Sequence, residues 1–198
     1  MTLFSLKSPA RHEEIIKRSR FLTLADAAST PEQAMAFIQK HSVPDATHNC
    51  WAYQIGDEYR FSDDGEPAGT AGRPILQAIQ GQQCDQVVVL VIRWFGGVKL
   101  GTGGLVRAYG GCAAQCLRLA AKIEIVDELA VRCHCPFSDM ALVQSCFAPL
   151  RIRIENEDFD ARGVNWELRV PATVYDDFHD QFMNQTRGQG SCRVLDAD

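Results

Sequence analysis

The most constraining feature of the sequence is a glycine-rich segment that directly follows an apolar run. Residues 87–92 read Val-Val-Val-Leu-Val-Ile, and seven glycines fall between residues 93 and 111. Six consecutive apolar residues are typical of a strand buried on both faces, and glycine permits backbone conformations that other residues avoid. The sequence therefore predicts a strand over 86–94, a tight loop, and a buried, tightly packed helix of small residues over 105–121.

The distribution of glycine also predicts two domains. Of the 15 glycines, 12 precede residue 112, so the segments that need special backbone geometry belong to the first part of the chain. We place the boundary near residue 128, which gives domains at 1–128 and 129–198. Function is expected in the first of them.

Hydrophobic periodicity and turn residues predict an α+β fold class for both domains. In the first domain, Thr30 and Pro31 are typical of an N-cap and first position of a helix that ends near His41. The second domain has the element order βαββαβ of the ferredoxin-like split unit. The remaining predicted elements of the first domain are strands within 15–24 and 49–55, a polar loop over 61–72 and a helix over 74–79. Those of the second domain are strands at 129–135, 151–156, 164–170 and 191–195, and helices at 138–147 and 172–184.

The charge of the chain excludes some classes of partner. With 20 basic and 25 acidic residues the net charge is −5, which argues against coating nucleic acid or an anionic membrane through bulk charge. The first 128 residues carry 13 basic and 14 acidic side chains, a net charge of −1, so a local basic patch is compatible with the composition. Because no signal peptide or membrane-spanning run is visible, we expect a cytoplasmic protein without membrane association.

Eight cysteines lie within apolar segments, and we interpret them as reduced, buried side chains. Cys133 and Cys135 alternate with His134 along a predicted strand, which directs the two thiols to one face and the imidazole to the other. Cys50 and His48 share a strand face, but an apolar strand offers no means of forming a thiolate. We therefore predict no bound metal, no cofactor and no catalytic residue.

The glycine-rich loop is a candidate anion site. It joins a strand to a helix, a context in which backbone N–H groups converge on an anion. No complete phosphate-loop motif is present, so the alternative is a tight packing turn. Trp94 and Phe95 beside the loop could stack on nucleic-acid bases if exposed, or belong to the core. The candidate nucleic-acid or anion-binding residues are Arg73, Arg93, Lys99, Gly101, Thr102, Gly103, Gly104 and Arg107.

The polar loop over 61–74 is a second candidate functional segment. Asp63, Asp64 and Glu66 surround one glycine and could hold Mg²⁺ or act in acid–base chemistry. The alternative is a solvated turn in which Asp63 and Asp64 bond local backbone. With His48, these carboxylates form the candidate functional surface.

Three segments together resemble one family. They are 48–53 (His-Asn-Cys-Trp-Ala-Tyr), 61–74 (Phe-Ser-Asp-Asp-Gly-Glu-Pro-Ala-Gly-Thr-Ala-Gly-Arg-Pro) and 91–110 around the glycine-rich loop. They closely resemble the IMPACT family, and the whole chain is similar to its bacterial YigZ-type branch. The resemblance implies a ribosomal protein S5 domain 2-like fold for the first domain, and a ferredoxin-like fold similar to elongation factor G domain V for the second.

The resemblance implies a role in translation. Eukaryotic members act by competing for the activator of an amino-acid-starvation kinase, through a partner-binding domain that these 198 residues do not show, so we do not expect that role to transfer. Our leading hypothesis is a non-enzymatic protein that binds RNA, the ribosome or translation factors and regulates translation. The alternatives are a magnesium-dependent enzyme acting on a phosphorylated or nucleotide substrate, and a docking module for protein partners with an exposed apolar patch. The oligomeric state is left open.

Overall fold

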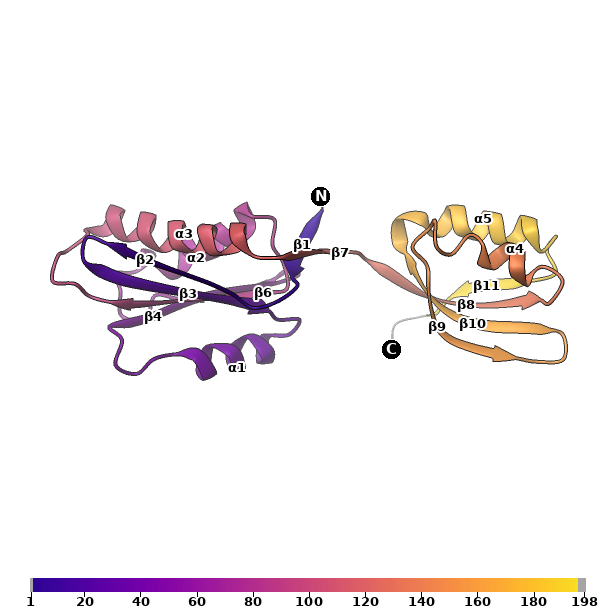
Figure 1. The fold of residues 1–198 in the computed structure, drawn as a ribbon, viewed down its shortest axis with the longest axis horizontal. Coiled ribbons are helices and arrows are strands. Elements are labelled where there is room, and N and C mark those ends of the chain that lie inside the picture. Colours follow the sequence, from indigo (N-terminus) through magenta and orange to yellow (C-terminus); the bar gives the residue numbers. More distant parts are fainter. Residues whose placement is uncertain (1, 196–198) are drawn as a thin grey trace. The chain divides into compact units, whose positions relative to one another are not determined.

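The chain forms two compact units, which divide between residues 125 and 126. The structure is a computed structural model that describes residues 2–195. Figure 1 shows an antiparallel sheet covered by helices in each unit. The fold class is therefore α+β, as expected.

The first unit is built on a five-stranded antiparallel sheet with helices on both faces. In Figure 1 two helices, α2 and α3, cover one face and α1 covers the other. The strands, in their order across the sheet, are β2 (Ala10–Ile16), β3 (Ser19–Ala27), β6 (Val87–Trp94), β4 (His48–Ile55) and β5 (Glu58–Ser62). The helices are α1 (Pro31–His41), α2 (Gly72–Gly81) and α3 (Thr102–Leu119).

The central strand β6 confirms the prediction from the apolar run. Residues 87–92 are fully buried, and β6 pairs with β3 on one side and β4 on the other. Val87, Val89 and Val91 pack in the core beneath α2 and α3, whereas Val88 packs in the core beneath α1. A strand covered on both faces needs apolar residues at every position, because both sets of alternating side chains leave water.

The predicted start of α1 agrees with the structure, whereas the predicted start and burial of α3 do not. Thr30 Oγ1 accepts a hydrogen bond from the N–H of Gln33 at the start of α1, as predicted. The helix α3 begins three residues before the predicted start, and it is not buried all round: Gly111 is exposed, and nothing lies within 4 Å of a Cβ added there. Small residues therefore mark close packing on one face of α3 only.

Three short strands of the first unit were not predicted. The edge strand β5 pairs only with β4, and its side chains are mostly exposed, so no burial pattern marks it. β1 (Leu3–Leu6) and β7 (Lys122–Ile125) pair antiparallel with each other. Each has four residues, too few for alternation to be recognised.

The second unit confirms the predicted element order βαββαβ. Its sheet has the order β11-β8-β10-β9, and all neighbouring strands are antiparallel. Cys133 and Cys135 are fully buried and His134 lies on the other face, as the alternation predicted. The elements are β8 (Glu128–Pro136), α4 (Met140–Gln144), β9 (Arg153–Phe159), β10 (Gly163–Pro171), η1 (Ala172–Val174), α5 (Tyr175–Gln185) and β11 (Ser191–Val194).

The helix α4 is much shorter than the predicted helix over 138–147. Turns replace its expected C-terminal part, where Pro149 disfavours the helical conformation for the residue before it and cannot donate a backbone hydrogen bond. Over residues 2–195, no helix has the length and apolar character needed to cross a membrane.

Candidate functional site

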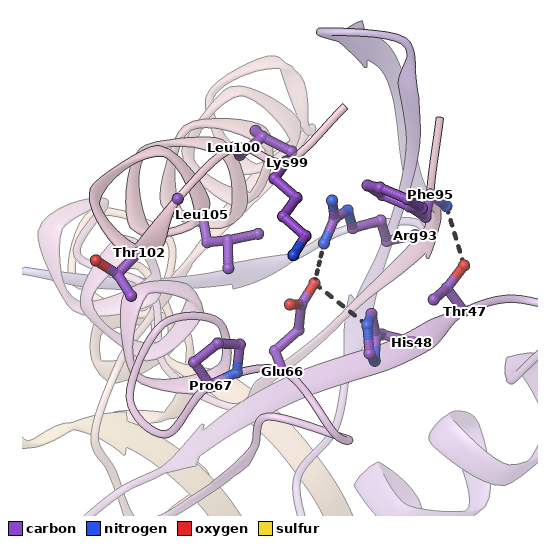
Figure 2. Close-up of a pocket in the computed structure, with 11 residues that line it drawn as sticks. Thr47, His48, Glu66, Pro67, Arg93, Phe95, Lys99, Leu100, Thr102 and Leu105 are labelled. Carbon is purple, nitrogen blue, oxygen red and sulfur yellow. Dashed lines mark hydrogen bonds and ion pairs between the residues drawn. The ribbon is translucent and has the colours of Figure 1, made fainter. Parts of the chain in front are cut away.

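A cavity of about 470 Å³ opens on the first unit where the glycine-rich loop meets two other segments (Figure 2). The loop between β6 and α3 forms one wall, the start of β4 forms another, and the loop before α2 closes the base. Both apolar and charged side chains line it. The lining residues are Thr47, His48, Glu66, Pro67, Arg93, Phe95, Lys99, Leu100, Gly101, Thr102 and Leu105.

Glu66 lies at the centre of the polar contacts in this pocket. Its side chain is only 4% exposed, and its Oε1 accepts hydrogen bonds from Arg93 (2.5 Å) and from the hydroxyl of Tyr109 (2.7 Å). His48 Nε2 lies 3.7 Å from the same oxygen. The other oxygen, Oε2, has no hydrogen-bond partner among residues 2–195, and in Figure 2 it points away from Arg93 and His48. Glu66 thus presents a free acceptor to the pocket.

The buried guanidinium of Arg93 is held on several sides. Besides Glu66, it donates a hydrogen bond to Ser19 Oγ over 3.2 Å, and it lies 5.5 Å from the ring centres of both Phe21 and Phe95. Its charge is balanced by the Glu66 carboxylate, so Arg93 shapes the pocket more than it adds positive charge. Tyr109 completes the cluster. Burial raises the pKa of its phenol far above the ordinary range, so the hydroxyl keeps its hydrogen and donates it to Glu66.

The orientation of His48 is set by the backbone of the neighbouring loop. Its Nδ1 lies 2.7 Å from the carbonyl oxygen of Asp64. A carbonyl can only accept, so Nδ1 donates this hydrogen bond and Nε2 is the ring nitrogen left for other partners. Nε2 is the nitrogen on the Glu66 side. The pocket therefore contains an imidazole nitrogen beside the carboxylate.

The opposite wall of the pocket offers hydrogen-bond donors and a positive charge. Gly101 adopts a φ of +75°, which favours glycine, and α3 begins at the next residue without a side-chain cap. The first helical hydrogen bond comes from the N–H of Leu105, which leaves the N–H groups of Thr102, Gly103 and Gly104 unbonded within the described chain. Lys99 is exposed and forms no ion pair with any described residue. This wall is suited to an anion.

Four of the predicted anion-binding residues do not line the pocket, namely Gly103, Gly104, Arg73 and Arg107. Arg107 lies on α3 with its guanidinium near Gly103, and it lines a separate cavity with His12 and Glu14. Arg73 is exposed on the first turn of α2. Of the predicted anion-binding residues, the cavity is therefore lined by Arg93, whose side chain is buried, and by Lys99, Gly101 and Thr102.

The three carboxylates of the 61–74 segment have different roles. Asp63 accepts hydrogen bonds from the backbone N–H groups of Gly69, Ala71 and Gly72, at 2.8 to 2.9 Å. Asp64 accepts one from the N–H of Asn49. Asp63 stabilises the local turn, as in the alternative interpretation, whereas Asp64 ties the loop to β4 and only Glu66 faces the pocket. No group of three or more potential metal ligands occurs in residues 2–195, so the three carboxylates are not brought together as the magnesium hypothesis requires.

Cys50 does not have the environment of a nucleophile. Burial raises the pKa of its thiol to about 12, and the nearby Glu66 carboxylate contributes in the same direction, against a hydrogen bond with Tyr109. The thiol donates to the carbonyl oxygen of Asp63. A thiol of such high pKa stays protonated at neutral pH and is inert.

Sequence reasoning did not identify Tyr109, Ser19 or Thr47 as members of the site. Thr47 accepts a hydrogen bond from the N–H of Phe95, and Ser19 accepts from Arg93 and from the N–H of Gly96. One signal was available for Tyr109: it lies seven residues after Thr102, two turns along the same face of α3, where a buried hydroxyl needs a partner.

The fold and the pocket define a two-unit α+β protein whose first unit carries a charged cavity at a helix N-terminus. Residues 17–117 match the family described as the Impact N-terminal domain, and full-length bacterial relatives also match. The chain belongs to the IMPACT family.

The relatives cover most of both units. An IMPACT family member of Thermus thermophilus is 51% identical over 79% of this chain and 87% of its own. One from Haemophilus influenzae is 36% identical over 96% and 95%, and YigZ of Escherichia coli is 34% identical over 91% and 92%. A solved crystal structure of a hypothetical protein, 31% identical, has a TM-score of 0.66 over 100% of this chain and 98% of its own.

Proposed function

We propose that the protein binds RNA, free or within the translation machinery, through the pocket of its first unit, and that it does so without catalysing a reaction. The observation that carries this proposal is the wall formed by Lys99 and the unbonded N–H groups at the start of α3. A phosphate group suits both the positive charge and the convergent donors.

The surface beside this wall is also basic. A Cβ at Gly96 would lie 2.0 Å from the carbonyl oxygen of Arg18, so the turn between β2 and β3 contacts the glycine-rich loop. Lys17 and Arg18 in this turn are exposed and form no ion pair with any residue from 2 to 195. Together with Lys99 they extend the positive surface beyond the pocket, which supports contact with further phosphates of a strand.

Phe95 supplies a ring for base stacking. It is 46% exposed at the mouth of the pocket, and the guanidinium of Arg93 lies on its inner side. Aromatic rings beside a basic wall bind single-stranded nucleic acid because bases stack on the ring while the phosphates meet the charges. The exposure of Phe95 therefore supports base stacking rather than a place in the core.

We propose the finer fold assignments on similar grounds. The order β11-β8-β10-β9 with βαββαβ connectivity supports a ferredoxin-like second unit, similar to elongation factor G domain V. The IMPACT resemblance supports an S5 domain 2-like first unit. The resemblance implies that both folds occur in translation proteins, and this supports a role in regulating translation.

The test is fluorescence anisotropy with single-stranded and structured RNA at low salt, repeated with ribosomes. We expect Lys99→Ala to weaken binding several-fold and to reduce the salt dependence by about 0.7 in log–log slope, the value for one phosphate contact on a single strand. Lys40→Ala is the matched control, because Lys40 is exposed at the end of α1 on the opposite face of the sheet. Absence of binding by the wild type to all three ligands would remove the proposal.

Docking of a protein partner is the second candidate, favoured by the exposed Val98 beside Phe95. It predicts a different outcome of the same experiment. Ribosomes would bind while isolated RNA would not, and Val98→Ser would weaken binding whereas Lys99→Ala would leave it unchanged.

A further inference from the structure

We infer that the pocket holds the 3′-terminal nucleotide of an RNA strand, with its phosphate at the N-terminus of α3 and its two terminal ribose hydroxyls against Glu66 and His48. This inference rests on the proposed RNA binding and specifies which part of the RNA the pocket recognises.

The size of the pocket limits what enters it. A volume of about 470 Å³ is in the range of pockets for single small molecules, whereas a protein that follows a strand uses an open groove. The cavity has one donor wall at α3 and one exposed ring, Phe95. It therefore has room and contacts for one nucleotide.

The acceptor side of the pocket determines the chemistry of the far end of the ligand. The side chain of Glu66 is only 4% exposed. Its Oε2 faces the cavity without a hydrogen-bond partner among the described residues. A carboxylate oxygen that faces a pocket accepts a hydrogen bond from a ligand donor and repels an anion. In an uncharged imidazole whose Nδ1 donates to Asp64, Nε2 of His48 is a second acceptor.

A ligand that fits both walls is anionic at one end and offers two donors at the other. The 3′-terminal nucleotide of RNA meets this requirement, since it has a phosphate on its 5′ side and free 2′- and 3′-hydroxyls. An internal nucleotide has a second phosphate where these hydroxyls would lie, and that phosphate would meet the Glu66 carboxylate. A 5′-hydroxyl end offers one donor for two acceptors, and a deoxyribose end also offers one.

The inference is tested by competition among oligonucleotides of one sequence that differ only at their ends. The series contains the 2′,3′-diol, a 3′-phosphate, a 2′-deoxy terminus and a circular form, each competing with a labelled diol strand on the wild-type protein. We expect the diol to bind best, the 3′-phosphate and circular forms to bind at least about tenfold more weakly, corresponding to about 1.4 kcal/mol, and the deoxy terminus to lie between them.

Two results would overturn the inference while leaving RNA binding intact. One is equal affinity for linear and circular strands, which would show that no chain end is recognised. The other is equal affinity for adenosine 5′-monophosphate and the diol strand, which would assign the pocket to free nucleotides. A failure of every RNA to bind would instead remove the proposed function itself.

Glu66→Gln tests the role of the charge directly. The amide keeps the size of the side chain but removes the repulsion, so the preference for the diol over the 3′-phosphate is expected to fall to within about threefold. Asp45→Asn is the matched control, because Asp45 is exposed and does not line the pocket, and it should keep the full preference. Should Glu66→Gln fail to fold, His48→Gln replaces it, with loss of the preference for the diol over the deoxy terminus as the expected result. An unchanged preference in the folded variant counts against the assignment.

Discussion

Arg93 donates a hydrogen bond to Glu66 Oε1 over 2.5 Å, and the two side chains are 5% and 4% exposed. The pair joins the end of β6 to the loop before α2 and forms one side of the pocket. A buried ion pair requires both partners, because removal of one leaves a charge in a poorly solvating environment. Glu66 is also the residue on which recognition of a ligand donor depends in our proposal.

Removal of the cation should destabilise the first unit strongly. We expect Arg93→Met to lower the free energy of unfolding by about 3–5 kcal/mol, because Glu66 then keeps a buried charge without its cation. Urea denaturation measures this loss. The control is Arg11→Met, which breaks the exposed pair of Arg11 with Glu13 and should cost less than about 1 kcal/mol. Similar losses of unfolding free energy for the two variants would contradict the expected cost of leaving the buried Glu66 charge unpaired.

Two glycines of the segment 93–111 should respond in opposite ways to alanine. A Cβ on Gly96 would lie 2.0 Å from the carbonyl oxygen of Arg18, whereas a Cβ on Gly111 meets nothing within 4 Å. We expect Gly96→Ala to destabilise the protein by about 1–3 kcal/mol or more, because two backbone segments must move apart. Gly111→Ala should stabilise it by about 0.5–1 kcal/mol through helix propensity. Thermal unfolding of both variants checks the pair, and a loss of stability in Gly111→Ala would contradict the account of α3.

Stability should fall at alkaline pH partly because of Cys112. Burial, and then the nearby Glu14 carboxylate, raise the pKa of this thiol from 9.0 to about 12 in the folded protein. The thiol therefore stays protonated in the folded state while it ionises in the unfolded state. A group with a raised folded pKa contributes stability that is complete below the unfolded pKa and is lost as pH rises from about 9 toward 12.

The corresponding measurement is urea unfolding of the wild type and Cys112→Ala across this range. Between about pH 8.5 and about pH 10.5, the wild type should lose about 2 kcal/mol more than the variant. Cys116→Ala serves as the graded comparison, because burial raises the pKa of Cys116 only to about 11. Parallel pH profiles for wild type and Cys112→Ala would show that this thiol is not protected from ionisation by the fold.

The parts of the fold that were predictable have signals within a few residues of one another. The six apolar residues of β6, the Thr30 cap of α1 and the alternation of Cys133 and Cys135 each depend on local periodicity or local hydrogen bonds. The strands β1 and β7 lack such a signal, and β5 has no burial pattern, although Gly56 and Asp57 form the two-residue turn that joins it to β4. They form because a distant or edge-strand partner is available, and hydrogen bonds between backbones carry no information about side chains.

The candidate site likewise combines features that the local sequence predicts with features that depend on distant partners. The sequence by itself determined that a glycine-rich loop joins a buried strand to a helix, and that three carboxylates and a histidine lie in the neighbouring segments. Only the tertiary structure decided which carboxylate faces the pocket. Arg93 and Tyr109 select Glu66 from 27 and 43 residues away, while backbone N–H groups within nine residues occupy Asp63. Spacing along a chain specifies local turns, but the partners of a buried charge are set by which strands and helices pack together.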